Sequence, residues 1–145
     1  MKTLHLEASW IIKAPREAIY KIMTDFENYP KRFPKVAKSA RIISQNGNDY
    51  VIAVQTKSFG KTWQVTMNTQ MRPPEGFISE NISEFGIEHE KFLMEETSEG
   101  TKINYINDVE IKSFFFRIFG RILVSWYAMK YWERAVIDKL REMLE

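Results

Sequence analysis

Residues 14–39, APREAIYKIMTDFENYPKRFPKVAKS, interrupt what is otherwise a succession of strand-like segments. Before them, residues 4–12 alternate between apolar and polar side chains, which is the period of a half-buried strand. After them come about six more such segments, and the chain closes on a long amphipathic helix. This order predicts an α+β fold in which a curved, seven-stranded antiparallel sheet grips one C-terminal helix. Such an arrangement tends to leave a cavity between the sheet and the helix.

Two short helices are expected inside the interrupting stretch. Pro15 suits the first turn of a helix, and the apolar stripe of that helix consists of Ile19, Ile22 and Met23. Asp25 is positioned to cap a second short helix, which Pro30 and Pro34 are expected to end. The prediction is therefore two small helices directly after the first strand.

Turn-forming residues divide the middle of the chain at hairpin spacing. They occur at positions 46–49, 60, 73–76, 86 and 98–100. The strands expected between them are residues 36–44, 50–58, 61–72, 77–83, 87–95 and 101–111. No repeat, linker or low-complexity segment interrupts this pattern, so residues 1–145 are expected to form a single domain.

The apolar period changes to 3.6 residues from about Ser113 onward. At 100° per residue, one helix face collects Phe115, Ile118, Ile122, Trp126, Met129, Trp132, Val136, Leu140 and Met143. A helix of roughly 30 residues is about 45 Å long, which is enough to cross a small sheet. Gly120 marks a possible kink or a late start of this helix.

Composition narrows the class of protein. The chain has 145 residues, of which 44% are hydrophobic and 28% charged, as in a soluble globular protein. The absence of Cys excludes disulfides, thiolate nucleophiles and thiolate metal sites. The N-terminus lacks a signal-peptide run, and Arg117 and Arg121 interrupt the longest apolar stretch, so no transmembrane helix is expected. These features together predict a soluble, cytoplasmic protein.

The inward faces of the strands and of the long helix carry many aromatic and Met side chains. Such side chains can simply fill a core, but their excess over Leu and Val favours a cavity with an adaptable lining. The residues expected to contact a ligand are Trp10, Phe33, Ile52, Val54, Trp63, Val65, Met67, Phe92, Met94, Tyr105, Asn107, Ile122, Trp126 and Met129.

Tyr105 and Asn107 are the polar members of this set. A buried phenol or amide without a hydrogen-bond partner costs about 1–3 kcal/mol, so each of them must find one. A ligand carbonyl or hydroxyl is one partner, and a buried water or a neighbouring backbone group is another.

Signals for catalysis or for a metal site are weak. His5 and His89 are the only histidines, no G-x-S-x-G motif surrounds a Ser, and no Gly-rich loop suits a phosphate. Glu88, His89 and Glu90 are consecutive, but on a strand His89 faces away from both glutamates. We therefore expect no catalytic residues, no metal and no cofactor.

Two surface features suggest partners. An outward apolar stripe on the long helix, with Arg117 and Arg121 nearby, suits an anionic membrane surface, a homodimer or packing against residues 26–35. It consists of Phe116, Leu123, Val124, Tyr127 and Tyr131. Residues 12–41 are basic and residues 75–100 acidic, which either steers an anionic partner or reflects ordinary solvated surfaces.

The basic run at residues 29–35 interleaves cations with aromatic side chains, as RNA-binding surfaces do. Because the run is short and the net charge is only +2, a loop at the cavity mouth with Phe33 as its gate fits better. Nucleic acid or the ribosome remains the weaker alternative.

The stretch that begins at residue 14 resembles the START-like, or helix-grip, superfamily, which includes polyketide cyclase/dehydrase and lipid-transport proteins. The resemblance rests on Ala14, Asp25, Tyr29, Pro30, Phe33, Pro34 and Ser39. Within that superfamily, the pattern D-x-x-x-Y-P-x-x-F-P followed by Ser is similar to the branch of coenzyme Q-binding proteins and ribosome-association toxins. The usual aromatic of that branch in the sixth strand corresponds to Phe92.

The resemblance implies a cavity that binds or carries a lipid, an isoprenoid quinone or a polyketide-like aromatic without catalysis. A second hypothesis is a cyclase, aromatase or dehydratase that uses the same cavity, with Tyr105, Glu133 or Arg41 as its acid–base group. A titratable pair within hydrogen-bond reach inside the cavity would favour this enzyme. A third hypothesis is a ribosome-associated regulator that acts through the basic loop.

Overall fold

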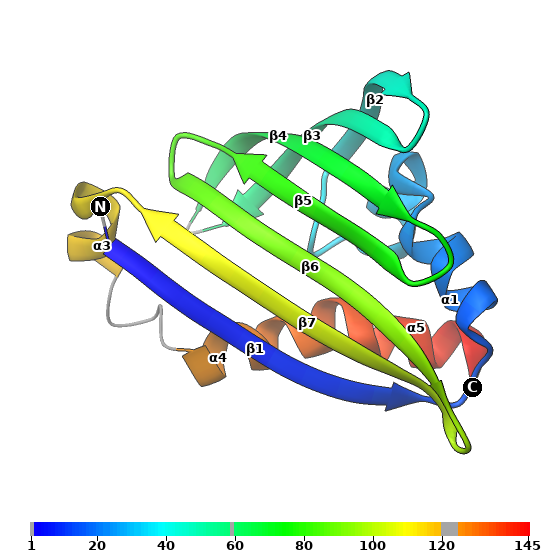
Figure 1. Cartoon of the computed structure of the whole chain (residues 1–145). Coiled ribbons are helices and arrows are strands. Elements are labelled where there is room, and N and C mark those ends of the chain that lie inside the picture. The colour runs from blue at the N-terminus through cyan, green and yellow to red at the C-terminus, as the bar shows by residue number, and fades with distance from the viewer. Residues whose placement is uncertain (1, 59, 120–124) are drawn as a thin grey trace.

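A single curved antiparallel sheet forms most of the molecule (Figure 1). The structure is a computed structural model, and it describes residues 2–58, 60–119 and 125–145. Its strands are β1 (Lys2–Ile12), β2 (Ser39–Asn46), β3 (Asp49–Ser58), β4 (Lys61–Arg72), β5 (Gly76–Ile82), β6 (Gly86–Thr97) and β7 (Gly100–Ile111). They are ordered β1-β7-β6-β5-β4-β3-β2, and all neighbours are antiparallel. The predicted seven-stranded helix-grip sheet is confirmed.

Two short helices and a 3-10 turn connect β1 to β2. They are α1 (Arg16–Met23), η1 (Phe26–Asn28) and α2 (Tyr29–Arg32). The expectation that Pro30 ends the second helix is wrong, because Pro30 lies in the first turn of α2. A proline is tolerated there, since the first N–H groups of a helix have no partner within it. Asp25 Oδ2 instead accepts a hydrogen bond from Arg32 Nη1 at 2.7 Å. This ion pair links the start of η1 to the end of α2.

The C-terminal part contains helix α3 (Ser113–Phe119) and a longer helical run that lies behind the sheet in Figure 1. That run consists of α4 (Ser125–Trp132), the π-helical turn η2 (Glu133–Ile137) and α5 (Asp138–Leu144). Gly120, Arg121, Ile122, Leu123 and Val124, which carried parts of the predicted helix faces, lie outside the described residues. No helix within the described ranges is both long enough and apolar enough to cross a membrane.

One aromatic stack fastens the long helical run to one side of the sheet. The Trp132 ring lies 4.1 Å from the Tyr105 ring and 5.3 Å from the Trp10 ring, and both pairs are stacked. In the next turn, η2 buries three consecutive residues, Ala135, Val136 and Ile137. A π-helical turn is wider than an α-helical turn, which lets neighbouring residues face the same side.

The far end of the concave face is covered by α1, η1 and α2. Phe26 of η1 packs edge-on against Phe77 of β5, with ring centroids 5.6 Å apart. Phe77 in turn stacks on Phe92 of β6 at 5.5 Å. Phe33 is 0% exposed within this cluster, so it belongs to the core and is not the predicted gate at a cavity mouth.

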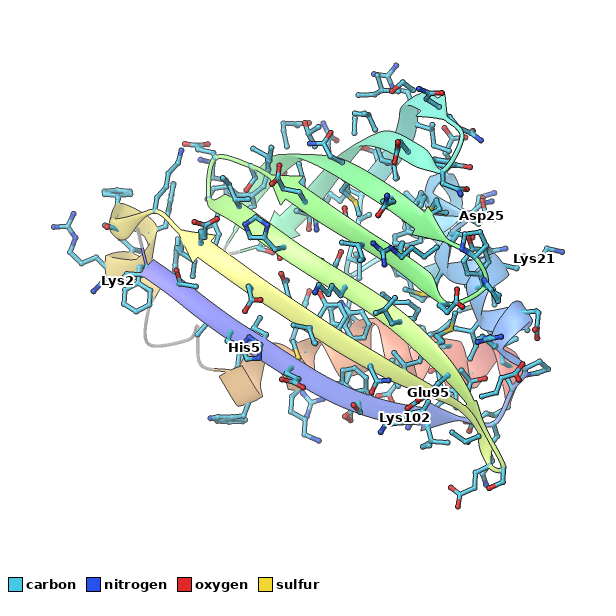
Figure 2. The ribbon with its side chains drawn as sticks, in the orientation of Figure 1. Lys2, His5, Lys21, Asp25, Glu95 and Lys102 are labelled. Atoms are coloured by element: carbon cyan, nitrogen blue, oxygen red, sulfur yellow. The ribbon has the colours of Figure 1, made fainter. Side chains whose placement is uncertain are left out.

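The other face of the sheet carries charged and polar side chains (Figure 2). His5 Nδ1 of β1 lies 2.5 Å from Asp108 Oδ1 of β7, and Lys102 Nζ lies 3.7 Å from Glu95 Oε1 across β7 and β6. His89 Nε2 lies 2.8 Å from Glu110 Oε2 on this outer face, as the alternation of the strand predicts. These exposed ion pairs contribute little stability, and they mark which face is turned to water.

Four side chains of the predicted helix faces lie elsewhere. Trp126, Ile118 and Met143, expected to face the sheet, are 71%, 55% and 41% exposed. Trp126 is six residues before Trp132, or about 120° around the helix, so it turns outward once Trp132 faces the sheet. Phe116, expected on the outer stripe, packs against the cluster of Leu6, Val109 and Ile111.

Gly76 and Gly47 make a matched pair for testing how closely β5 approaches β6. Both have positive φ, 145° and 61°. A Cβ at Gly76 would lie 1.9 Å from the Phe92 carbonyl oxygen, whereas a Cβ at Gly47 meets nothing within 4 Å. We expect Gly47→Ala to lower the free energy of unfolding by about 1 kcal/mol and Gly76→Ala by roughly 3 kcal/mol or more. Urea denaturation measures both, and equal losses would contradict the close approach of β5 and β6.

Candidate ligand-binding cavity

A cavity of about 320 Å³ lies between the concave face of the sheet and the helices that cover it. Strands β2 to β7 form its roof, and residues of α1, η1, α2, α4, η2 and the connecting loops form the remaining walls. Most of the wall is apolar, and eight of its side chains are aromatic. They are Phe26, Tyr29, Trp63, Phe77, Phe85, Tyr105, Tyr131 and Trp132. This volume and this lining suit a small organic molecule.

Five of the residues that the sequence analysis expected to contact a ligand line this cavity. They are Val54, Trp63, Val65, Met67 and Tyr105. Trp63 also donates its indole N–H to the Ser58 carbonyl at 3.0 Å, which holds the ring at the ends of β3 and β4. The alternation of β3 and β4 therefore places their predicted side chains as expected.

The other predicted contacts that the structure describes do not line the cavity. Four of them are buried in the core: Phe33, Ile52, Phe92 and Met94. Asn107 is also buried, and Trp10 and Met129 are partly buried against the core. Trp126 points away from the sheet into solvent, and Ile122 lies outside the described residues. These inward positions act as packing that supports the wall.

A row of polar side chains crosses the concave face from β4 to β7. The pairing of the strands places Thr69 beside Ser79, Ser79 beside Glu90, and Glu90 beside Asn107. Thr69 Oγ1 and Ser79 Oγ lie 2.8 Å apart, and Ser79 donates to Asn81 Oδ1 at 2.6 Å. This row brings hydrogen-bonding groups into a face that is otherwise apolar.

Two carboxyl groups of β6, Glu88 and Glu90, line the cavity next to this row. Tyr105 donates its hydroxyl to Glu90 Oε2 at 2.5 Å, and Asn81 Nδ2 donates to Glu90 Oε1 at 3.2 Å. Asn107 Nδ2 donates to Glu88 Oε1 at 2.8 Å. Among the described residues, Tyr105 and Asn107 thus donate to carboxyl groups, a kind of partner that the sequence analysis did not consider.

Burial changes the ionisation of this cluster. Both glutamates are half-buried, and they lie on the wall of the cavity. Loss of water, and then the charge of Glu90, raise the pKa of Glu88 to about 7, although the hydrogen bond from Asn107 opposes the rise. Loss of water also raises the pKa of Glu90, against the hydrogen bonds from Tyr105 and Asn81. Near neutral pH the carboxyl of Glu88 is therefore poised to gain or lose its proton.

Sequence reasoning missed Glu88 and Glu90 as cavity residues, although the signal was present. They have the same parity along the strand as Phe92 and Met94, which were predicted to face inward. Glutamates are rarely buried, so their charge alone favours a position on the outer face of the sheet. The alternation of the strand was the better guide.

The mouth of the cavity lies between the segment after α2 and helix α4. Lys35 and Tyr131 are both exposed, and both line the cavity. The Tyr131 hydroxyl donates to the Lys35 carbonyl oxygen at 3.0 Å across this opening. The sequence analysis expected Phe33 as the gate of this mouth, whereas Lys35 and Tyr131 lie at its edge and Phe33 is buried.

The other groups proposed for acid–base chemistry lie outside the cavity. Glu133 Oε2 accepts a hydrogen bond from Trp10 Nε1 at 3.2 Å, and Arg41 is exposed on β2. Among the residues that the structure describes, no group of three or more His, Asp or Glu side chains is arranged to hold a metal ion.

The raised pKa of Glu88 predicts a pH-dependent stability. In the unfolded chain the pKa of this carboxyl is near its ordinary value of 4.5, but in the folded protein it is about 7. The folded state thus binds the proton more tightly, and stability falls as pH rises through this interval. Glu88→Gln removes this ionisation. The free energy of unfolding of the variant should therefore exceed that of the wild type by a margin that grows between about pH 5 and pH 8. The margin should reach at most roughly 3 kcal/mol.

Chemical denaturation at a series of pH values measures this difference. Glu99→Gln, in the exposed turn between β6 and β7, controls for the loss of a carboxyl elsewhere. A Glu88→Gln effect that stays constant across this pH range would show that Glu88 ionises normally in the folded protein.

Comparisons with known proteins agree with this architecture. A START superfamily protein from Mycobacterium smegmatis has 14% identity and a TM-score of 0.73, covering 97% of this chain and 96% of that chain. The major latex-like protein 151 from Panax ginseng has 9% identity and a TM-score of 0.76, covering 99% and 98%. The Zhui aromatase/cyclase from Streptomyces sp. R1128 has 14% identity and a TM-score of 0.70, covering 77% and 70%. At such identities these structures show a shared fold.

The sequence itself matches one family over most of its length. A search of curated protein sequences found no match. The family described as polyketide cyclase/dehydrase and lipid transport matches residues 12–128, from the end of β1 into α4. Together with the helix-grip sheet and its hydrophobic ligand-binding architecture, this match shows that the chain belongs to the polyketide cyclase/dehydrase and lipid transport family of START-like proteins.

Proposed function

We propose that this protein binds and carries an apolar small molecule in the cavity beneath β3 to β7. The observation that carries the proposal is the cavity of about 320 Å³, walled mainly by aromatic and aliphatic side chains. A lipid chain segment, an isoprenoid quinone or a polyketide-like aromatic has the matching apolar character. Affinity would come from apolar burial at about 25 cal/mol per Å², and orientation from the Glu88, Glu90 and Tyr105 cluster.

Filling the cavity with a larger side chain tests the proposed binding directly. Val65 lines the cavity, whereas its neighbour Thr66 is exposed on the outer face of β4. A neutral solvatochromic naphthalene dye should bind the wild type with a blue-shifted emission. Val65→Trp fills part of the cavity and should weaken dye binding by tenfold or more, which is about 1.4 kcal/mol or more.

Thr66→Trp is the matched control, because it adds the same side chain to the opposite face of the strand. It should leave the affinity for the dye within about twofold of the wild type, since faces of one strand alternate. Circular dichroism confirms that both variants are folded. Equal binding by all three proteins would place the dye elsewhere and refute the proposal.

One observation favours a second candidate function, catalysis in the same cavity. Tyr105 and Glu90 form a titratable pair at 2.5 Å inside it, and Glu88 has a pKa of about 7. A group with such a pKa can take and return a proton near neutral pH. This arrangement suits the cyclisation or dehydration of a polyketide-like chain.

Incubation with a linear poly-β-ketone thioester, followed by absorbance of aromatic products, tests this second candidate. Tyr105→Phe keeps the ring but removes the hydroxyl, and it should lower the rate by about a hundredfold or more. Tyr127→Phe, on the exposed side of α4, should leave the rate unchanged. Absence of aromatic products from the wild type would reject catalysis on this substrate class.

A further inference from the structure

The polar cluster of the cavity has more hydrogen-bond acceptors than donors. Glu88 and Glu90 together present four carboxyl oxygens, and the donors that reach them are Tyr105, Asn81 and Asn107. Within residues 2–58, 60–119 and 125–145, Glu88 Oε2 receives no hydrogen bond. Each carboxylate oxygen can accept from more than one donor, so the cluster retains unused capacity on the cavity side.

A second acceptor is left unpartnered next to these carboxyl groups. Asn107 is 3% exposed, and its Oδ1 is buried without a hydrogen-bond partner in the described part of the chain. Its Nδ2 is already engaged by Glu88 Oε1 at 2.8 Å. A buried polar atom without a partner is unfavourable by about 1–3 kcal/mol, so this amide oxygen adds to the excess of acceptors around the two carboxyl groups.

No cation of the described residues balances the two carboxyl groups. Neither Glu88 nor Glu90 forms a salt bridge with any described Lys, Arg or His. The cation on the cavity wall is Lys35, which is exposed at the mouth. A buried carboxylate without an opposite charge is strongly disfavoured, so a cation brought by a ligand would be correspondingly favoured.

The remaining wall is also suited to a cation. Trp63 and Phe77 present aromatic rings to the same cavity. The faces of such rings attract a cation, most strongly when water is excluded. Carboxylates combined with aromatic rings are the chemistry that recognises an ammonium group on an apolar molecule.

We propose that the polar end of the ligand is a protonated amine, seated against Glu88 and Glu90, with its apolar part enclosed by the aromatic wall. The N–H donors of a primary ammonium match the unused acceptor capacity of the two carboxyl groups, which line the cavity. This inference rests on the proposed binding function, because it requires an occupied cavity. It adds the chemical class of the ligand, an arylalkyl or alkyl amine.

Three probes with one ring system separate charge from shape. Naphthylmethylamine is a cation near neutral pH, naphthylmethanol is neutral, and naphthoate is an anion. Calorimetric titration should rank their affinities in that order, with the amine at least about tenfold tighter than the alcohol, as expected for charge-assisted hydrogen bonds. The wild-type protein is used throughout as the reference.

Two variants assign the preference to the carboxyl pair. Glu88→Gln and, independently, Glu90→Gln should each reduce the amine-to-alcohol affinity ratio by about fivefold or more, because they remove charge while keeping the shape. Glu80→Gln, an exposed carboxyl on the outer face of β5, should leave the ratio unchanged. That control distinguishes the cavity from general attraction by acidic surface residues.

The outcomes separate this inference from the function on which it rests. If the alcohol binds as tightly as the amine, or if both cavity variants keep the wild-type ratio, the amine assignment is overturned while apolar binding stands. If naphthoate binds most tightly, the assignment is likewise overturned. If none of the three probes binds, the proposed binding function fails, and the amine assignment fails with it.

Discussion

The stack of Trp132 between Trp10 and Tyr105 is the contact on which the cavity depends. At 4.1 Å and 5.3 Å between ring centroids, it fixes the C-terminal helical run against β1 and β7, at one edge of the sheet. A curved sheet is wider than one helix, so the concave face beyond this edge needs another cover. Helices α1 and α2 supply that cover at the far end, and the space beneath β3 to β6 remains open.

The strand order was predictable because the chain carries both turn-forming residues and an alternation of apolar and polar side chains. Turn residues such as Gly60 and Gly86 divide the segments, and alternation then assigns each side chain to a face. Trp63, Val65 and Met67 therefore lie where the sequence analysis placed them. Alternation says which face a residue occupies, but it does not say whether that residue meets a neighbour or a void. This is why Ile52 and Phe92, also inward, are packed and line no cavity.

The helix faces were less predictable for a geometric reason. A wheel drawn at 100° per residue assumes one uninterrupted α-helix. The described residues instead include the π-helical turn Glu133–Ile137, which changes the angular register. Trp126 was assigned inward together with Trp132, although the two lie about 120° apart on such a wheel, and it is exposed. An error in the assumed angle per residue accumulates along a helix. In a sheet, each turn starts a new strand, and the alternation of faces is read afresh from there.

The carboxyl cluster links the stability of the fold to whatever occupies the cavity. Ionisation of Glu88 next to Glu90 destabilises the folded protein, because the two charges share a site with little water. A molecule that binds only the folded state stabilises it in proportion to its concentration and affinity. Anything that offsets the charge of Glu88 thus lowers the pKa of this group and restores the stability lost by ionisation. Binding and proton release are then two expressions of one interaction, located where β5, β6 and β7 bring Asn81, Glu88, Glu90 and Asn107 together.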